Sequence, residues 1–541
     1  MNKIITNLKK NKLLLCYSFF EGFLLMYGSL LNMDKSLSNF KLYMFLIVLA
    51  FTSIFYILNN IYFKILSFTY KREEKHKFSK RKLLILWLII LILWIPVLLA
   101  YYPSIWAYDV YDQVPHLIGQ NVTNKHPIIH TLFIELFLII GKKINEYTFG
   151  ILLLTIVQMI IMSFIFSYSI EKINCKINNK KIRFLITSLL IIYFGIIPFN
   201  SIMSISITKD VLFSGLTLLL LIFIYDFIDE EKISKLKYIM FMMIAVLFIL
   251  IKSNSLFIFI FLTLMFIILY NGNKKKKIII VSFSSIIISI ILNSILVAST
   301  NSKKYSKFET YNIQIQNLIY VAIKHPSINE NKEELFDIIP RKCFDKNLSN
   351  DFDINRVDYA KDKLVNCDLN NFNYNKFNNT WIKYGLKYPI DYIDSWSNVT
   401  IGSWYLLDET HANTYPGDNQ GYLLTDYKYI EGISEEVPDS KFPWLFDKLE
   451  RVATINVQYK NIGIWRFIFA PATYVLSYLL LLVYVLSKKL RNELIPLMIL
   501  LGVSITILNA PVIVVRYIYP FMVCVPIIFV RLFTTKKEKL N

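Results

Sequence analysis

The sequence predicts an all-α, multi-pass membrane protein with about twelve transmembrane helices and one large, mainly helical domain outside the membrane. The 541 residues are 55% hydrophobic and 16% aromatic, which is too apolar for a soluble protein of this length. Apolar stretches of about twenty residues with few charges recur along the chain, and each is long enough to cross the hydrocarbon core as a helix. Short basic runs separate these stretches, as they do in the loops of membrane proteins.

The predicted crossings occupy twelve windows. They are 13–33, 41–66, 83–102, 148–169, 184–200, 211–227, 238–251, 255–270, 278–298, 466–487, 493–510 and 512–532. The first follows a basic N-terminus, but no small-residue cleavage site comes after it, so we expect an uncleaved helix. The segments GIIPFN (195–200) and KSNS (252–255) are expected to be the turns that divide the closely spaced windows between 184 and 270.

The charge distribution predicts the orientation of the chain. Basic runs lie between the apolar windows, at 71–82, 176–183, 274–277, 488–491 and 536–539. Alternating crossings bring all of these runs to one face together with both termini, which is the positive-inside pattern near anionic lipid. The net charge of +20 is therefore assigned to membrane topology and not to nucleic-acid binding. The richness in Ile, Lys and Asn suggests an AT-rich bacterial genome. From this and the charge pattern we expect a bacterial plasma-membrane protein with both termini cytoplasmic.

The same alternation predicts three parts. Residues 1–298 form an N-terminal transmembrane module whose first outer loop is 103–147; residues 299–464 form an extracytoplasmic domain; residues 465–541 form C-terminal transmembrane helices. The predicted domain has 19 Lys and Arg against 23 Asp and Glu, a net charge of −4, whereas the rest of the chain carries +24. A net-acidic segment inside a basic protein fits export to the outer face.

Of the five cysteines, only Cys343 and Cys367 fall in the predicted outer domain. In an oxidising compartment these two are candidates for a disulfide, and two unpaired thiols are the alternative.

An aromatic stripe marks residues 378–399 of the same domain. Trp381, Tyr384, Tyr388, Tyr392 and Trp396 recur at intervals of three and four residues. Such spacing is typical of a packing face. A helix lying flat on the bilayer and a glycan-binding groove are the alternatives.

The first outer loop gathers titratable groups. It contains Asp109, Asp112 and three of the chain's six histidines, His116, His126 and His130. A carboxylate at an outer membrane interface can act as a general base toward a hydroxyl or hold a divalent cation. The alternative is that Asp109 and Asp112 cap or solubilise a turn. The histidines do not match a zinc-binding spacing.

His126-Pro127 opens an apolar segment that carries His130 and Glu135 and ends at GKK (141–143). Proline suits the first turn of a helix, so a helix is expected to begin here. Counting it as a crossing would invert the charge pattern downstream. We expect it to lie along the outer leaflet or to dip into it.

Two further polar features reach the same face. Lys209 and Asp210 lie at the outer mouth of the sixth helix, and Arg516 lies about one turn inside the last. Ionisable residues at membrane depth are costly and typically functional. Arginine and lysine facing an outer cavity suit a lipid-linked phosphate. The alternatives for Arg516 are snorkelling and pairing with Glu21 or Glu135.

In order, these residues form an outer-loop acid, a His-Pro that opens an apolar helix, and a late Arg-Tyr-x-x-Pro. The pattern resembles the GT-C superfamily of membrane glycosyltransferases, in the branch of protein O-mannosyltransferases and aminoarabinose transferases. A bacterial group of uncharacterised GT-C-like proteins is more similar still. The segments that carry this likeness are PSIWAYDVYDQ (103–113), KHPIIHTLFI (125–134), TKDVLF (208–213) and IQIQNLIYVAI (313–323).

The likeness has two departures: Ile128 replaces the second proline of an HPP motif, and Ser104 replaces a glycine. Neither removes a charged group. The resemblance implies that Asp109 activates the acceptor and that Arg516 and, more loosely, Lys209 bind the donor phosphate. Supporting or acceptor-side roles are assigned to His126, Asp112, His130, Asp210 and Tyr517.

We therefore expect an inverting glycosyltransferase that moves a sugar from a polyprenyl-phosphate-linked donor to an extracytoplasmic acceptor, which is an envelope glycan, a lipid or a protein. No cofactor is certain, although the acidic loop is compatible with Mg²⁺ or Mn²⁺. The alternatives are a lipid-linked glycan polymerase or ligase, a polytopic transporter or flippase, and a non-catalytic scaffold. A transporter often shows a half-repeat, and none is evident here.

Overall fold

The structure is a computed structural model of the whole chain. It describes residues 11–33, 36–68, 77–106, 110, 113–114, 122–303, 307–325, 343, 350, 352–365, 367, 373–407, 440–453 and 466–534.

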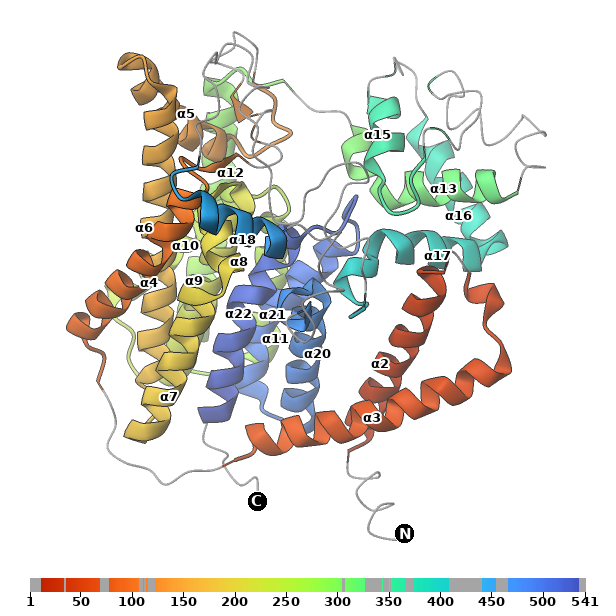
Figure 1. Cartoon of the computed structure of the whole chain (residues 1–541), viewed down its shortest axis with the longest axis horizontal. Helices are drawn as coiled ribbons and strands as arrows, with labels where there is room; N and C mark the ends of the chain where they lie inside the picture. Colours follow the sequence, from red (N-terminus) through yellow and green to blue (C-terminus); the bar gives the residue numbers. More distant parts are fainter. Residues whose placement is uncertain are drawn as a thin grey trace.

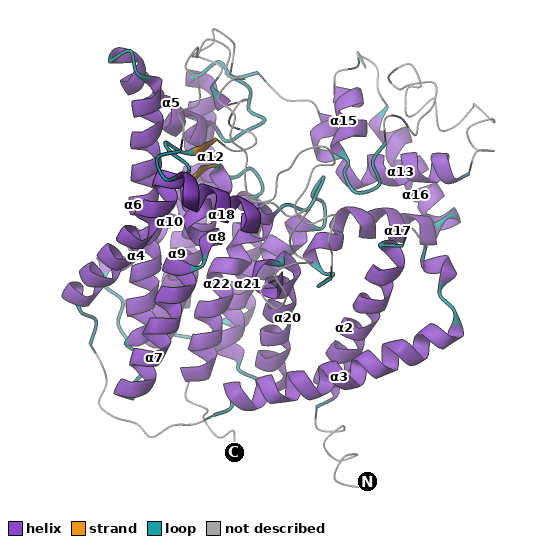
Figure 2. Ribbon diagram, viewed as in Figure 1, coloured by secondary structure: helices purple, strands orange, loops and turns teal. Residues whose placement is uncertain are grey.

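Helices make up most of the described residues (Figure 1, Figure 2). They are α2 (Lys12–Leu31), α3 (Leu42–Leu66), α4 (Lys80–Ala100), α5 (Ile128–Lys143), α6 (Tyr147–Asn174), α7 (Lys180–Ile191), α8 (Pro198–Ile205), α9 (Lys209–Asp229), α10 (Lys235–Ile251), α11 (Ser255–Leu269), α12 (Lys275–Ser299), α13 (Asn312–Lys324), α15 (Asp358–Val365), α16 (Tyr374–Lys387), α17 (Pro389–Thr400), α18 (Pro443–Ala453), α19 (Arg466–Phe469), α20 (Pro471–Ser487), α21 (Arg491–Ile507) and α22 (Val515–Thr534). Short helical turns occur at η1 (Leu37–Asn39), η3 (Ile192–Ile196), η4 (Lys307–Thr310) and η7 (Ile401–Ser403).

A helix occupies each of the twelve predicted windows, and the prediction of an all-α membrane protein is confirmed. Seven helices of the described residues are long and apolar enough to cross a bilayer: α2, α3, α4, α6, α9, α12 and α22. An eighth crossing results if the bent pair of Lys180–Ile196 and Pro198–Ile205 is counted as one span. The helices α11 and α20 are apolar but shorter.

The expected turn at GIIPFN (195–200) is a bend instead. The chain passes through the π-turn η3 and continues at a 48° angle into α8, which begins with Pro198. Proline has no N–H to extend a preceding helix, but its fixed φ suits the first position of a new one. The break before α9 lies further on, at residues 206–208. By contrast, the expected turn at KSNS (252–255) is confirmed, since α10 ends at Ile251 and α11 begins at Ser255.

The helices α9 and α22 are the centre of the bundle and pack against each other. In α9, 78% of the apolar window is buried and in α22 72%, against 22% in α3 and 28% in α12. The outer helices therefore present apolar side chains outward, as expected of surfaces that face lipid. Asp210 at the start of α9 and Arg516 at the start of α22 therefore lie in the interior of the protein.

Two short strands join the segment after α4 to the segment before α9. β1 (Ile105–Trp106) pairs in parallel with β2 (Ser206–Ile207), with Trp106 opposite Ile207. Gln158 of α6 supports the second strand, because its side-chain amide donates to the carbonyls of Ser204 at 2.9 Å and Ser206 at 2.8 Å. This ladder brings the first predicted outer loop beside the N-terminus of α9.

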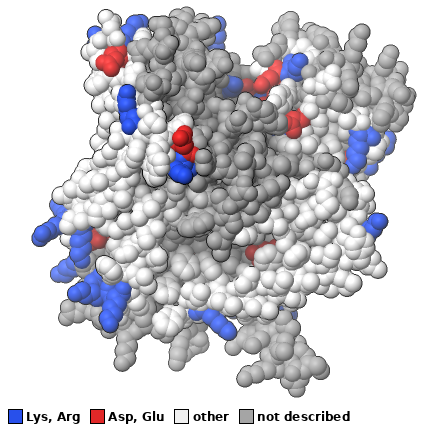
Figure 3. All heavy atoms as spheres, in the orientation of Figure 1, with Lys and Arg blue, Asp and Glu red and all other residues white. Residues whose placement is uncertain are grey.

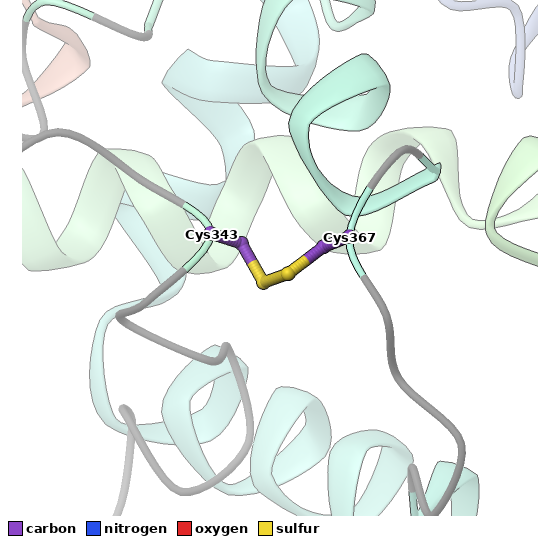
Figure 4. Close-up of a disulfide and its surroundings, with 2 residues drawn as sticks. All are labelled: Cys343 and Cys367. Atoms are coloured by element: carbon purple, nitrogen blue, oxygen red, sulfur yellow. A yellow bond between two sulfur atoms is a disulfide. The ribbon is translucent and has the colours of Figure 1, made fainter.

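The helices α13, α15, α16 and α17 have a hydrophobic core of their own. It contains Phe308, Ile313, Ile315, Leu318, Ile319, Val321, Ala322, Val357, Ala360, Leu364, Phe377, Tyr384 and Val399. Trp381, Tyr388, Tyr392 and Trp396 pack against this core, so the interpretation of the aromatic stripe as a packing face is confirmed. A disulfide joins Cys343 and Cys367, the pair that the sequence put forward, with Cα atoms 5.7 Å apart (Figure 4).

The last described part of the predicted outer domain belongs with the bundle. The helix α18 packs against α4, where the rings of Tyr101 and Phe446 lie 5.0 Å apart. The backbone N–H of Lys441 donates to the carbonyl of Leu99 at 2.9 Å.

Basic side chains gather at the end of the bundle where α4 and α7 begin (Figure 3). They are Lys80, Arg81, Lys82, Lys180, Lys181 and Arg183. The group α13 to α17 lies at the opposite end (Figure 1). The molecule therefore has a basic end and an end that carries a separate helical group.

Candidate functional site

The candidate site is built around the first turn of α9. Thr208 is the N-cap of this helix, and its hydroxyl accepts from the backbone N–H of Asp210. Lys209 and Asp210 are the first two helical residues, as predicted, and the Asp210 side chain is fully buried. A buried carboxylate needs compensating charge, because desolvation disfavours an unpaired ion.

Two cations from other elements supply that charge. Lys252, in the turn between α10 and α11, donates to one oxygen of Asp210 at 2.5 Å. The Nε atom of Arg516, on α22, lies 3.7 Å from the other oxygen. Lys209, which precedes Asp210 in the chain, adds a third cation nearby, although its partly buried ammonium group lies beside His126. These four residues are called the Asp210 cluster below.

Aromatic rings line the cluster. The Lys252 ammonium lies 4.8 Å from the ring centre of Phe213 and 5.0 Å from that of Tyr517. The Arg516 guanidinium carbon lies 5.1 Å from the ring centre of Tyr517. Such cation–π contacts replace part of the hydration that a buried cation loses.

Arg516 is the second residue of α22 and lies in its first turn, slightly nearer the end of the helix than expected. It is 4% exposed. Its described carboxylate contact is Asp210 and not one of the two alternatives from the sequence. One of those, Glu21, instead accepts from the side-chain amide of Asn59 at 2.6 Å.

The two described histidines of the first loop lie in different surroundings. The Nδ1 atom of His126 is 3.2 Å from the Lys209 ammonium nitrogen, so His126 extends the Asp210 cluster. Pro127 is the N-cap of α5, and the helix itself begins at Ile128. His130, one turn further on, is fully buried and pairs through Nδ1 with Gln113 Oε1 at 2.6 Å. Among the described residues, no group of three His, Cys, Asp or Glu side chains could hold a metal ion.

Asp109, Asp112 and His116 lie outside the described residues. Their predicted roles stay predictions. The described chain reaches Trp106, three residues before Asp109, in register with Ile207 and thus just before the first turn of α9.

A cavity of about 380 Å³ adjoins the cluster. It lies between the start of α5, the turn from α10 to α11, and α12, and its lining includes Asn124, His126, Pro127, Ile128, Ile249, Leu250, Ser253, Leu256, Ser289, Ile290, Asn293, Ser294 and Val297. His126 therefore contacts Lys209 and also lines the cavity. The amide and hydroxyl groups of this lining can hydrogen-bond a polar ligand, and the aliphatic side chains can contact its apolar surface.

Lys252 is the member of the cluster that the sequence analysis missed. The segment KSNS was interpreted only as a turn, because Asp210 precedes Lys252 by 42 residues and no local pattern links them. A signal was present: a cation in a turn between two apolar helices, at the face predicted for Lys209. Such a cation is unusual under the positive-inside rule.

A second buried arginine lies at the other end of α22. Arg531 is 6% exposed and pairs with Asp229 at 2.7 and 2.8 Å. It also pairs with Glu493 of α21, at 2.6 Å for the shortest contact. Lys176 lies 2.7 Å from Asp229. These residues are called the Arg531 cluster.

The fold and the site define a helical membrane protein with a buried cation-rich cluster at one end of its bundle and a polar cavity beside it. The chain belongs to a family of unknown function, DUF6020, whose model matches residues 115–541. The matched span contains His126, Lys209, Lys252 and Arg516 and begins after Asp109 and Asp112. No curated protein and no solved structure shows significant similarity to the chain.

Proposed function

We propose that this chain is a membrane glycosyltransferase that moves a sugar from a polyprenyl-phosphate-linked donor to an acceptor outside the cytoplasm. The observation that carries the proposal is that Lys252 and Arg516 meet at the buried Asp210, next to Lys209 and beside a polar cavity. A lipid-linked phosphate needs buried cations, and the sugar attached to it needs an adjoining site with hydrogen-bonding groups.

The cluster suits a phosphate leaving group. Arginine presents a planar fork of donors to phosphate oxygens, and lysine adds a compact point charge. Asp210 holds two of these cations, so their charges are positioned before a substrate arrives. Fixed cations near the leaving oxygen would stabilise the negative charge that develops there, and removal of one such group typically costs roughly 3–4 kcal/mol.

The proposed orientation puts the Asp210 cluster on the outer face. The basic starts of α4 and α7 support a cytoplasmic location for the opposite end. The Cys343–Cys367 disulfide supports an oxidising compartment for the helical group α13 to α17. We propose that the chain crosses a bacterial plasma membrane twelve times, with both termini inside and residues 299–464 outside.

The proposed reaction is a direct displacement. Asp109 takes the proton of an acceptor hydroxyl, the acceptor oxygen bonds to the anomeric carbon, and the bond from that carbon to the phosphate oxygen breaks. The electron pair of that bond stays on the phosphate, next to Arg516, Lys252 and Lys209. Attack from the side opposite the phosphate inverts the configuration of the sugar, so a retained configuration would contradict this scheme. No step depends on Mg²⁺ or Mn²⁺, although the acidic first loop is compatible with either ion.

The cavity beside His126 is the proposed place of the transferred sugar. Asn124, Ser253 and Asn293 offer amide and hydroxyl groups that can pair with sugar hydroxyls.

The helical group α13 to α17 is proposed to select the acceptor. A lipid-linked glycan polymerase or ligase would use the same phosphate contacts and differs in its product, which is a long polymer. A transporter would move its substrate without forming a new bond.

The test is a comparison of envelope glycans by mass spectrometry. A deletion strain is complemented with wild type, Asp109→Asn, Arg516→Gln, or Lys276→Gln, which removes an exposed cation at the end of α12 far from the cluster. All proteins are brought to equal membrane levels. We expect one sugar mass to disappear in the deletion and to return with wild type and Lys276→Gln only. Full restoration by Arg516→Gln would refute the phosphate role, and no glycan change in the deletion would refute the transferase.

A further inference from the structure

The bend between α16 and α17 carries an exposed aliphatic ridge that the proposed reaction does not use. Ile382 and Leu386 of α16 are 53% and 80% exposed, and Ile390 and Ile393 of α17 are 41% and 43% exposed. In α16, Tyr384 faces the core of the helical group, and Ile382 and Leu386, two residues to either side of it, lie on the opposite face of that helix. Four exposed aliphatic side chains around one bend need a partner, since a patch of this kind is uncommon on a surface that faces water.

The position of the bend relative to the bilayer is set by its contacts with α2, a candidate membrane span. Asp394 of α17 accepts from the Tyr27 hydroxyl of α2 at 2.8 Å and from the backbone N–H of Leu37 at 3.0 Å. The rings of Tyr27 and Trp404 stack 5.8 Å apart in the same place. In Figure 1, α17 runs across the end of α2. A helix that spans the bilayer ends at its interface, so α17 lies at that level.

The ridge also points in the right direction. Ile390 precedes Asp394 by four residues, so both lie on nearly the same face of α17. Because Asp394 points toward the end of α2, Ile390 points toward the same side. After η1 the chain enters α3, and Leu42, the first residue of that helix, is 88% exposed. Exposed apolar side chains are therefore present on both sides of η1.

The exposed face of α16 changes along the helix. Its first half presents Asn375, Lys376 and Asn379, and its second half presents Ile382 and Leu386. Lys383 and Lys387 flank the apolar half, and the Lys387 ammonium lies 5.2 Å from the ring centre of Tyr388. Lysine and tyrosine around a small apolar surface are typical of segments at the level of lipid head groups. The lysines complement anionic lipid.

We propose that the α16–α17 bend inserts its aliphatic ridge into the bilayer as an interfacial wedge, with Lys383 and Lys387 at the head groups. The wedge holds the helical group α13 to α17 against the membrane surface. This proposal rests on α2 and on the ridge and is independent of the proposed reaction, so either one can fail alone.

The test uses spin labels on the full chain in nanodiscs of phosphatidylethanolamine and phosphatidylglycerol. Cys16, Cys175 and Cys524 are replaced, and the disulfide is kept. Single cysteines are then introduced as Leu386→Cys and Ile390→Cys, with Ile382→Cys as the substitute if either labelled chain is not monodisperse. The matched control is Asn379→Cys, which lies on the same face of α16 two turns away.

We expect the labels at 386 and 390 to collide more with oxygen than with a water-soluble nickel chelate, and the label at 379 to do the reverse. Equal nickel accessibility at 386 and 379 would overturn the proposal. So would a label at 386 that is immobile and shielded from both agents, because it would indicate a protein partner instead of lipid.

Discussion

Arg516 and Arg531 lie on one helix and are almost equally buried, yet their surroundings differ. Fifteen residues separate them, roughly 22 Å along an ideal helix. Arg531 makes short contacts with two carboxylates, Asp229 and Glu493. Arg516 lies 3.7 Å from Asp210, which Lys252 contacts more closely at 2.5 Å. At Arg531, carboxylates occupy the guanidinium group, and these contacts connect α9, α21 and α22. At Arg516, by contrast, several cations surround one acid, Asp210. Burial of an arginine in a membrane protein therefore does not by itself indicate a ligand site.

The largest expected effect is on folding and comes from Arg531. Arg531→Met leaves the buried Glu493 and the partly buried Asp229 without their main partner, which we expect to destabilise the protein by about 3–5 kcal/mol. Thermal unfolding in detergent and the amount of protein in the membrane measure this loss. Lys276→Gln is the control that removes a cation from the surface. If Arg531→Met melts like the control, the Arg531 cluster does not hold the bundle together.

Arg516→Gln is expected to separate function from stability. The proposed transfer rate should fall by about 10²–10³, because a cation at the leaving group is lost. The free energy of unfolding should change by less than roughly 1 kcal/mol, because Lys252 still neutralises Asp210. The measurements are transfer to acceptor in membranes and thermal unfolding of the same preparation. A variant that unfolds like Arg531→Met would mean that both arginines are structural.

Lys252→Gln tests the residue that the sequence did not single out. We expect a smaller loss of transfer, about 10-fold to 100-fold, because one charge-assisted contact of roughly 1.5–3 kcal/mol is removed. The rate should be compared at several donor concentrations. Wild-type transfer at every concentration would show that Lys252 serves Asp210 only.

The smallest effect is expected at a third ion group, in α15. Burial by itself would raise the pKa of Asp358, but Lys361 at 2.8 Å and Arg356 at 3.1 Å outweigh it and hold the pKa below its ordinary value. A carboxyl with a lowered pKa in the folded state stabilises the fold above its unfolded pKa of about 3.9 and stops doing so as the pH falls through the folded value. Melting temperatures should therefore be flat between about pH 7 and 5 and should fall below about pH 4. The melting temperature of Asp358→Asn should fall less steeply below pH 4 than that of the wild type. An identical dependence on pH in both proteins would exclude Asp358 as a contributor to this loss of stability.

The sequence predicted the members of the Asp210 cluster that stand at helix starts. Lys209, Asp210 and Arg516 are ionisable residues beside long apolar windows, and His126 precedes Pro127, the N-cap of α5. Hydropathy and cap chemistry are local, so they can be seen in a single chain. Lys252 was missed because its role depends on contact with Asp210, which only the packing of α9 against α10 provides. The docking of Asp394 on Tyr27 spans 367 residues and was unpredictable for the same reason. The bend at Pro198 was mistaken for a turn, because proline marks a helix start without fixing the angle to the helix before it.

The pairing of β1 with β2 has a consequence for tolerance to sequence change. The hydrogen bonds of this ladder join main-chain groups. Substitutions at Ile105 or Ile207 that keep an extended backbone should therefore leave the pairing of the two strands in place. Because the strands are parallel, β1 runs in the same direction as β2, which leads into α9. The ladder thus holds a constant spacing between Trp106 and the first turn of α9 through main-chain contacts. An inserted residue in either strand would change that spacing, and insertions there should be far less tolerated than substitutions.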